Sequence, residues 1–352
     1  MSIESYIGIN GRKVGSAYPA YIIAELSANH RQHYEEAVQL IHAAKESGAD
    51  AVKLQTYTPD TITIRSDRPE FMASSGSLWE GRTLYELYNE AYTPWEWQPK
   101  LKILADELGI TLFSTPFDKT AVDLLESMGV PAYKIASLEI VDIPLIEYIA
   151  GKGKPMLIST GASTLNEIQE AFKAAQKAGA SQIALLKCTS TYPAPPEEIN
   201  LRTIGHMAEA FGVPVGLSDH TLGIAVPIAA VALGACIIEK HFTLSRNTPS
   251  VDSAFSLEPD EFKAMVSAIR TAEKAVGEVR YEASPQEAAS RMFRRSLFIV
   301  KDVKQGEAFT AENVRSIRPG CGIHPRHLKD VLGHRAKQDL QLGTPLSWEL
   351  LV

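Results

Sequence analysis

The stretch VGLSDHTLGIAVPIAAVALGACIIEKHFTL, residues 215–244, contains two apolar runs that each end in a polar cluster with a histidine. The first run leads into Ser218-Asp219-His220 and the second into Glu239-Lys240-His241. A short apolar run rich in β-branched residues is typical of a strand buried on both faces. If the two runs are neighbouring parallel strands, their carboxyl ends lie side by side. The two histidines then face a shared point.

The pattern extends over the chain from residue 20 onward, where β-rich runs alternate with amphipathic stretches. Residues 35–50, 117–130 and 164–180 have apolar residues at helical spacing and a glycine near the end. Such alternation predicts a parallel sheet, and eight strands are the number that closes a (β/α)8 TIM barrel. An open doubly wound sheet is the alternative, but no G-x-G-x-x-G follows the first run. The eight predicted strands are 20–26, 51–56, 110–116, 132–137, 155–160, 183–189, 213–218 and 235–241.

We predict a barrel over residues 1–277, a polar linker over 278–294 and a small β-rich domain over 295–352. The last of these is too short and too poor in apolar residues for a second catalytic domain, and we expect a lid or docking module. The connection 57–93 is long and rich in aromatic residues, and such insertions usually serve function or subunit contact.

The formal net charge of −7 gives no reason to expect a nucleic-acid partner. Three cysteines, Cys188, Cys236 and Cys321, are too few for a disulfide framework, and the first two lie in apolar runs typical of a core. The N-terminal residues show no secretory signal, and no apolar stretch is long enough to span a membrane. We therefore expect a soluble cytoplasmic protein without a membrane partner.

Polar residues at the predicted strand ends carry the functional signal, because all carboxyl ends of barrel strands face one mouth. Any single serine there fits a cap or turn better than a catalytic role. Lys53 and Lys134 are more informative, because they lie inside apolar strands, where an unpaired ammonium is costly. One could pair with Glu25 or Glu139, but two of them among hydroxyl-bearing strand ends favour a pocket for an anion such as phosphate or carboxylate.

His220 and His241 end the seventh and eighth predicted strands. Two imidazoles, completed by water and substrate oxygens, make an open site for a divalent cation that could act as a Lewis acid on a carbonyl. The alternative is one structural histidine and one exposed histidine. The spacing matches no H-E-x-x-H or cysteine-based zinc motif.

The strand-end segments AELSANH, KLQTYTPD, FSTPFD, YKIASLE, LISTGAS, KCTSTYPAP, GLSDHT and EKHFTL occur in the order found in the sialic acid synthase family, which the chain resembles over nearly its whole length. The tail, RRSLFIVKDVKQGEAFTAENVRSIRPG, resembles that family's antifreeze-like (SAF) domain. Within the family, residues 77–97 and 187–195 resemble the subgroup that forms pseudaminic acid.

The resemblance implies condensation of phosphoenolpyruvate with an N-acetylated sugar aldehyde to a nine-carbon 2-keto acid, with release of phosphate. For the pseudaminate subgroup the sugar is 2,4-diacetamido-2,4,6-trideoxy-L-altrose. It also implies a divalent metal, Mn²⁺ before Mg²⁺ or Co²⁺, held by His220 and His241. Glu25 would be the acid, base or orienting carboxylate, and Lys53 and Lys134 would complete the catalytic set.

The remaining residues that the resemblance implies are substrate contacts. Phosphoenolpyruvate would meet the two lysines and Thr115, Ser137, Ser159, Ser190 and Ser218. The sugar would meet Gln55, Glu139, Tyr192 and Asp252. Arg318 would reach the sugar's N-acetyl group from the partner subunit, which implies a domain-swapped homodimer. The structural alternatives are helix capping for the serines and Asp252, packing for Tyr192 and a plain turn for Arg318.

Three readings compete with this synthase. A synthase acting on N-acetylmannosamine or on the legionaminate precursor differs only in the sugar. A barrel that binds sugar without catalysis would have little reason to keep two buried lysines. A metal-dependent hydrolase would need further ligands on the first and fifth strands, which offer only Glu25 and Ser159-Thr160.

Overall fold

The computed structural model describes residues 5–73, 76 and 78–352, and the chain divides into two compact units after Gly277. The first unit contains a closed barrel of parallel strands in the order β10-β3-β4-β5-β6-β7-β8-β9. All eight predicted strands are present, within a few residues of their predicted bounds, and the predicted TIM barrel is confirmed. They are β3 (Tyr21–Glu25), β4 (Ala51–Thr56), β5 (Thr111–Pro116), β6 (Tyr133–Ile135), β7 (Met156–Ser159), β8 (Ile183–Cys188), β9 (Val215–Asp219) and β10 (Ile237–His241).

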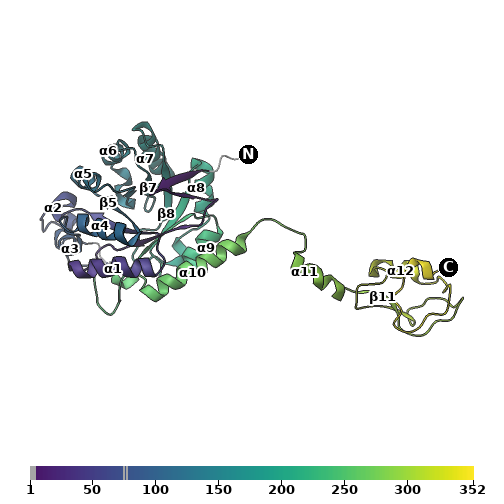
Figure 1. Ribbon diagram of the computed structural model, residues 1–352. Coiled ribbons are helices and arrows are strands. Elements are labelled where there is room, and N and C mark those ends of the chain that lie inside the picture. The colour runs from purple at the N-terminus through teal and green to yellow at the C-terminus, as the bar shows by residue number, and fades with distance from the viewer. Residues whose placement is uncertain (1–4, 74–75, 77) are drawn as a thin grey trace. The chain divides into compact units, whose positions relative to one another are not determined.

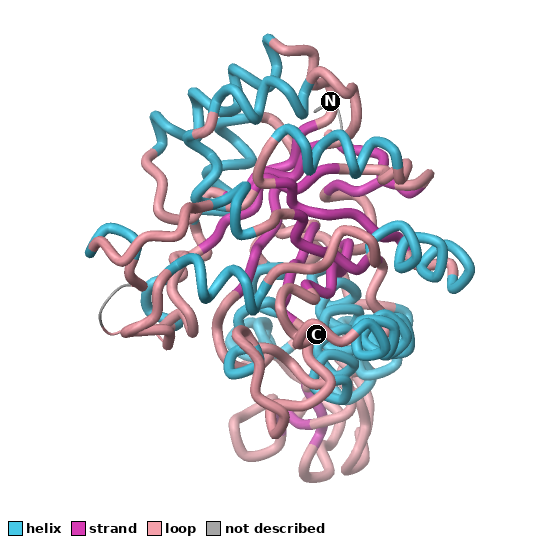
Figure 2. Tube along the Cα trace, turned by 90° about the vertical axis from the view of Figure 1, so that its left-hand side faces the viewer, coloured by secondary structure: helices cyan, strands magenta, loops and turns pink. Residues whose placement is uncertain are grey.

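Helices surround the strands of the barrel (Figures 1 and 2). Because the strands are buried on both faces, they read as nearly continuous apolar runs rather than as alternating ones. The surrounding helices are α1 (Tyr34–Glu46), α4 (Gln98–Leu108), α5 (Lys119–Ser127), α6 (Ile143–Ala150), α7 (Leu165–Lys177), α8 (Thr203–Phe211), α9 (Ala225–Ala232) and α10 (Pro259–Val276).

The helix ends follow from local sequence. Asp118 caps α5 by accepting hydrogen bonds from the backbone of Thr120 and Ala121, and Thr164 forms a capping box with Glu167 at the start of α7. Gly129 and Gly179, which follow these two helices, have positive φ angles of 67° and 107°. Only glycine adopts such angles without strain, so each chain segment can turn back toward the next strand.

The insertion between β4 and α4 forms α2 (Pro59–Ile62), η1 (Pro69–Phe71) and α3 (Leu84–Ala91), while residues 74, 75 and 77 lie outside the described part. Further short 3-10 segments are η2 (Ser137–Val141), η3 (Pro196–Glu198) and η4 (Ser253–Phe255).

A hairpin of β1 (Tyr6–Ile9) and β2 (Arg12–Gly15) precedes the barrel, and the sequence patterns did not predict it. Ile7, Ile9 and Val14 are buried in the barrel's core cluster. The backbone N–H of Gly8 donates to Gln182 just before β8, at 2.6 Å, so the hairpin packs against the amino ends of the strands.

The second unit has its own core, which includes Leu297, Ile299, Phe309, Val314 and Val331. Its antiparallel pair is β11 (Ser296–Ile299) and β12 (Val314–Ile317), and its short helical segments are α12 (Leu328–Val331), η6 (Pro325–His327) and η7 (Trp348–Leu350). The predicted linker contains α11 (Pro285–Ser290) and η5 (Arg291–Phe293), and most of its side chains are exposed. Among the described residues, no helix has the length and apolarity needed to cross a bilayer.

Candidate active site

The carboxyl ends of the strands bring the predicted catalytic residues into one layer of the barrel. The register pairs Glu25 of β3 with Lys53 of β4 on one side and with His241 of β10 on the other. Ser218 of β9 is in turn paired with Glu239 of β10. Parallel pairing therefore places the acidic, basic and imidazole side chains of Glu25, Lys53 and His241 at the same height, with Ser218 and Glu239 one side-chain step below.

Lys53 is the centre of a buried ionic cluster. Its ammonium forms an ion pair with Glu25, lies 3.6 Å from Oε1 of Glu239 and donates to Oγ1 of Thr115 at 3.1 Å. Burial lowers the pKa of Lys53, but Glu239 and Glu25 outweigh burial and the net pKa is raised. Burial raises the pKa of Glu25 to about 7. The cluster thus combines a persistent cation with a carboxyl group that can exchange a proton near neutral pH.

Lys134 of β6 has a different environment. Its ammonium donates to Oγ of Ser159 and to the carbonyl of Ile135, both at 2.7 Å, and no ion pair neutralises it among the described residues. Burial lowers its pKa, and Glu239 only partly opposes that effect. An anion bound here would supply the negative charge that the protein side chains leave missing.

Two serines, Ser137 and Ser190, approach Gly161 closely. Ser137 accepts a hydrogen bond from the backbone N–H of Gly161 at 3.1 Å. A Cβ atom at Gly161 would lie 2.3 Å from Oγ of Ser190 and 2.7 Å from Oγ of Ser137, so only glycine fits there. Oγ of Ser190 is buried and lacks a hydrogen-bond partner within the described chain. A buried hydroxyl without a partner indicates a site that a ligand completes.

The two histidines lie together, with ring centroids 5.3 Å apart. Nδ1 of His220 lies 2.9 Å from the carbonyl of Thr189, which can only accept, so Nδ1 carries the proton and Nε2 is left for a ligand in the neutral ring. Nδ1 of His241 is buried and, within the described chain, has no hydrogen-bond partner. Burial holds the pKa of His241 well below its usual value, which keeps the ring neutral.

These two nitrogens fit a divalent cation that takes its other ligands from substrate or water. No group of three His, Cys, Asp or Glu side chains in the described part of the chain is arranged to hold a metal. A site closed entirely by such side chains is therefore not indicated.

A cavity of about 750 Å³ opens above this charged layer. Of the predicted residues, its lining includes Gln55, Ser137, Glu139, Ser190, Tyr192, His241 and Asp252. Glu25, Lys53, Thr115, Lys134, Ser159, Ser218 and His220 are buried deeper in the barrel. The order along β4 explains why Lys53 lies deeper than Gln55, because Lys53 precedes it by two residues on the same strand. Gln55 lies next to the cavity and donates to Glu25 at 3.3 Å.

One wall of the cavity is apolar and comes mainly from the insertion 57–93. We call it the apolar wall; its residues are Tyr57, Ile62, Leu84, Leu87, Tyr88 and Phe117. The ring of Tyr57 packs edge-to-face against Tyr88 and Phe117, with centroids 5.7 and 5.2 Å apart. The lining also includes Glu139, whose pKa burial raises to about 7. The cavity therefore offers apolar and polar surfaces to one ligand.

The ring of Tyr192 packs against the histidines. Its centroid lies 4.4 Å from the ring centroid of His220 and 5.1 Å from that of Phe255. It is thus both a packing residue and a cavity residue. Asp252 accepts a hydrogen bond from Oγ of Ser27, and burial raises its pKa. Arg318 is an exposed residue of the second unit, beside the end of β12. Its predicted role remains a prediction.

Three residues of this site were not predicted from the sequence. Glu239 contacts Lys53 and accepts from Ser218 at 3.3 Å, and its Oε2 has no hydrogen-bond partner in the described chain. Side-chain alternation on β10 would have indicated it, because Glu239 shares a face with His241.

The other two residues are Ser27 and Cys188. Ser27 donates to Asp252, and Cys188 lies 3.8 Å from Nδ1 of His220. The prediction that Cys188 and Cys236 are buried is confirmed.

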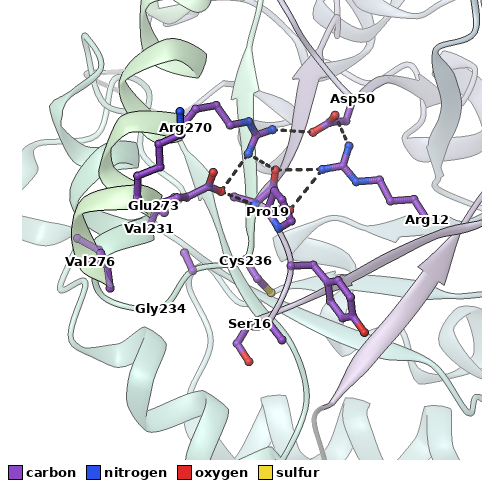
Figure 3. A pocket seen from close by; sticks show the side chains of 16 residues that line it. Arg12, Ser16, Pro19, Asp50, Val231, Gly234, Cys236, Arg270, Glu273 and Val276 are labelled. Carbon is purple, nitrogen blue, oxygen red and sulfur yellow. Dashed lines mark hydrogen bonds and ion pairs between the residues drawn. The ribbon is translucent and has the colours of Figure 1, made fainter. Parts of the chain in front are cut away.

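A second cavity, of about 880 Å³, lies at the opposite end of the barrel. Figure 3 shows its charged side chains bonded to one another: Arg12 and Arg270 both pair with Asp50, and Arg270 pairs with Glu273 at 3.0 Å. None of the predicted site residues lines this cavity. The charges of Arg12, Asp50, Arg270 and Glu273 satisfy one another, so we assign no chemistry to this cavity despite its size.

Comparison with known proteins identifies the family of the chain. The model of the NeuB family matches residues 40–281, and that of the SAF domain matches residues 294–352. The chain therefore belongs to the NeuB family and carries a C-terminal SAF domain, as the sequence motifs had implied.

The similar proteins include sugar acid synthases from several bacteria. The chain is 47% identical to the pseudaminic acid synthase of Helicobacter pylori over 330 residues, which cover 94% of this chain and 97% of the relative. It is 39% identical to the N,N'-diacetyllegionaminic acid synthase of Legionella pneumophila over 348 residues, 97% of each chain. The crystal structure of N-acetylneuraminic acid synthetase from Leptospira borgpetersenii in complex with citrate superposes with a TM-score of 0.73 at 30% identity, covering 82% of this chain and 95% of that one. The chain is accordingly an enzyme of the transferase class.

Proposed function

We propose that the protein condenses phosphoenolpyruvate with 2,4-diacetamido-2,4,6-trideoxy-L-altrose and water to give pseudaminic acid and phosphate. The observation that carries the proposal is the convergence of Lys53, Lys134, His220 and His241, from four separate strands, below one cavity. The identity to pseudaminic acid synthases over nearly the whole chain supports the choice among related sugars.

The site has the groups that binding of phosphoenolpyruvate needs. The substrate carries a phosphate and a carboxylate, and the buried ammonium groups of Lys53 and Lys134 supply the opposing charge. The hydroxyls of Thr115 and Ser159 bond the lysines, and those of Ser137, Ser190 and Ser218 also lie at the ends of the strands and can donate to substrate oxygens. Such donors, fixed before the reaction, stabilise charge that develops during it.

The reaction proceeds by attack of the enol carbon of phosphoenolpyruvate on the sugar aldehyde. A carbon–carbon bond forms, and positive charge develops at the carbon that bears the phosphate oxygen. Water adds to that carbon, and phosphate leaves with cleavage of the C–O bond. Glu25 is paired with Lys53 in this cluster, and burial raises its pKa to about 7, so it can take or return the proton that these steps move. No covalent enzyme intermediate is needed, so orientation and electrostatics account for catalysis.

His220 and His241 would hold a divalent cation, Mn²⁺ before Mg²⁺ or Co²⁺. The partnerless Nδ1 of His241 and the free Nε2 of His220 support this assignment. When bound, such a cation supplies Lewis acidity toward the aldehyde oxygen. His241 would contribute a neutral imidazole, because burial holds its pKa well below the usual value, and His220 would contribute Nε2 of its neutral form.

The apolar wall supports a deoxygenated, doubly acetylated sugar as the substrate. The 6-deoxy methyl and the acetamido methyls of the proposed sugar are apolar and can pack on aromatic and aliphatic side chains. Glu139 and Gln55 face the same cavity and can bond hydroxyl and amide groups. N-acetylmannosamine has a hydroxymethyl group at C6, where the proposed sugar has a methyl. The legionaminate precursor shares the methyl and is the nearer competitor.

For Arg318 we propose contact with the sugar's N-acetyl group in a domain-swapped homodimer. Arg318 lies within the residues that match the SAF domain, and its side chain is exposed, so a partner subunit could reach it. Mixing an inactive Lys53→Ala chain with an Arg318→Ala chain tests it, since swapped dimers would regain activity in one of their two sites. No recovery, or a monomer in sedimentation, would overturn it.

The direct test is phosphate release from phosphoenolpyruvate with Mn²⁺ and each of the three sugars. We expect the highest kcat/KM with the altrose sugar. Turnover with only the legionaminate precursor or N-acetylmannosamine would replace the sugar assignment but keep the reaction. Absence of turnover with every N-acyl sugar aldehyde, with unchanged function after Lys53→Ala, would favour the non-catalytic sugar-binding barrel.

A further inference from the structure

Asp219 and Lys240 form an ion pair on the two strands that carry the histidines. Each residue immediately precedes a histidine, and the register places the two opposite one another in β9 and β10. Nζ of Lys240 lies 2.5 Å from Oδ2 of Asp219, and both side chains are fully buried. Side chains alternate along a strand, so this pair faces away from the side that carries Ser218, Glu239 and His241.

The pair also holds the residue that follows His220. Oδ1 of Asp219 accepts from the backbone N–H of Thr221 at 3.1 Å, and Oδ2 accepts from its hydroxyl at 3.0 Å. Lys240 donates to the backbone carbonyl of Thr221. His220 thus lies between two residues that are both bonded to Lys240, and Lys240 is covalently joined to His241.

A fully buried ion pair is a poor device for stability, because desolvation of the two charges offsets most of their attraction. Apolar residues of similar size would hold two strands together equally well. They would not fix the backbone on both sides of His220, because that requires donors and acceptors aimed at Thr221. The chemistry of the pair therefore points to positioning of the imidazoles.

We propose that Asp219 and Lys240 are positioning residues that fix the separation and orientation of His220 and His241 and thereby set the affinity for a divalent cation. The inference rests on the metal site of the proposed function. It adds that the cation affinity is determined from the outer face of the barrel, by groups that touch neither the cation nor the substrates.

The test is calorimetric titration of the full chain with Mn²⁺, without substrates. The double variant Asp219→Asn/Lys240→Met removes the ion pair and the bond to the Thr221 carbonyl but leaves an acceptor for Thr221. We expect its Kd for Mn²⁺ to rise at least tenfold, with kcat reduced and KM for phosphoenolpyruvate changed less than twofold. Arg270→Met, which breaks an ion pair at the other end of the barrel, is the control and should keep the wild-type Kd.

A folded double variant with the wild-type Kd would overturn the inference, even if its melting temperature falls. Should the double variant fail to fold, Asp219→Asn alone decides: a Kd at least threefold higher supports the proposal, and an unchanged Kd overturns it.

If the wild-type protein itself does not bind Mn²⁺, the metal part of the proposed function fails, and the positioning role is decided separately. The ring ¹⁵N shifts of His220 and His241 in the metal-free protein should then change in the double variant and not in Arg270→Met. Unchanged shifts in both variants would overturn it.

Discussion

The two ends of the barrel both carry a cavity and a cluster of charges, but they differ in how the charges are satisfied. At the amino ends of the strands, Arg12, Asp50, Arg270 and Glu273 are partly exposed and bonded to one another (Figure 3). At the carboxyl ends, the charges are almost fully buried and several polar atoms lack partners.

This difference, rather than volume, identifies the functional end, since the cavity at the amino ends is the larger one. Oγ of Ser190, Oε2 of Glu239 and Nδ1 of His241 are buried without hydrogen-bond partners in the described chain. Each such group costs stability unless a ligand completes it, and a fold has no structural reason to gather them in one place.

The strongest test of the contrast is Lys134→Met at the mouth. We expect kcat/KM for phosphoenolpyruvate to fall about 1,000-fold, because the variant lacks a cation aimed at the developing charge. The melting temperature should change little, because removing this lysine leaves no buried carboxylate without an ion-pair partner. Lys187→Met is the matched control, since its ammonium also bonds only a carbonyl and a hydroxyl, of Cys188 and Thr189. Loss of activity in both variants would contradict the specific role of Lys134.

Glu139→Gln tests whether the buried carboxyl group of Glu139 in the cavity lowers the stability of the folded protein. Burial raises the folded-state pKa of Glu139 from 4.5 to about 7, so the folded state binds the proton more tightly than the unfolded state. Its contribution to stability is therefore complete below pH 4.5 and is lost as the pH rises toward 7. We expect the variant to be about 1 to 3 kcal/mol more stable than wild type at pH 8 and equal to it near pH 4. Urea unfolding at the two pH values measures this, and an equal difference at both would contradict the assigned cause.

Phe117→Ser tests the apolar wall. Removing one aromatic ring from a pocket that holds sugar methyls should lower kcat/KM for the deoxy sugar about tenfold and leave the KM for phosphoenolpyruvate unchanged. Phe211→Ser is a fitting control, because Phe211 makes a comparable ring contact with Phe172, 5.2 Å away, on the outside of the barrel. An effect on both substrates alike would indicate general damage rather than sugar recognition.

The smallest effect is expected at the other end of the barrel. Arg270→Met breaks ion pairs with Asp50 and Glu273, and partly exposed pairs contribute about 1 kcal/mol or less. A thermal melt should show a decrease of a few degrees, with kcat and both KM values within twofold of wild type. A clear loss of activity would mean that the two ends are coupled, and the contrast drawn between them would be wrong.

The barrel was predictable because its strands are buried on both faces. Burial on both sides requires continuous apolar runs, and such runs, with helix caps and glycine stops between them, are visible in a linear sequence. The hairpin β1–β2 was not predicted, because its strands are four residues each and only three of their side chains, Ile7, Ile9 and Val14, are anchored in the core. Too short a pattern carries no periodicity.

By itself, the sequence determined which strands exist, where they end and which polar residues stand at those ends, including the two lysines and the two histidines. Only the tertiary structure decided that Lys53 contacts both Glu239 and Glu25, and that Lys240 bonds the residues on both sides of His220. It also decided that the insertion 57–93 supplies an apolar wall of the cavity. The physical reason is that strand ends are local features. Pairing between charges depends instead on register and on which face each side chain takes, and both are fixed only when the barrel closes.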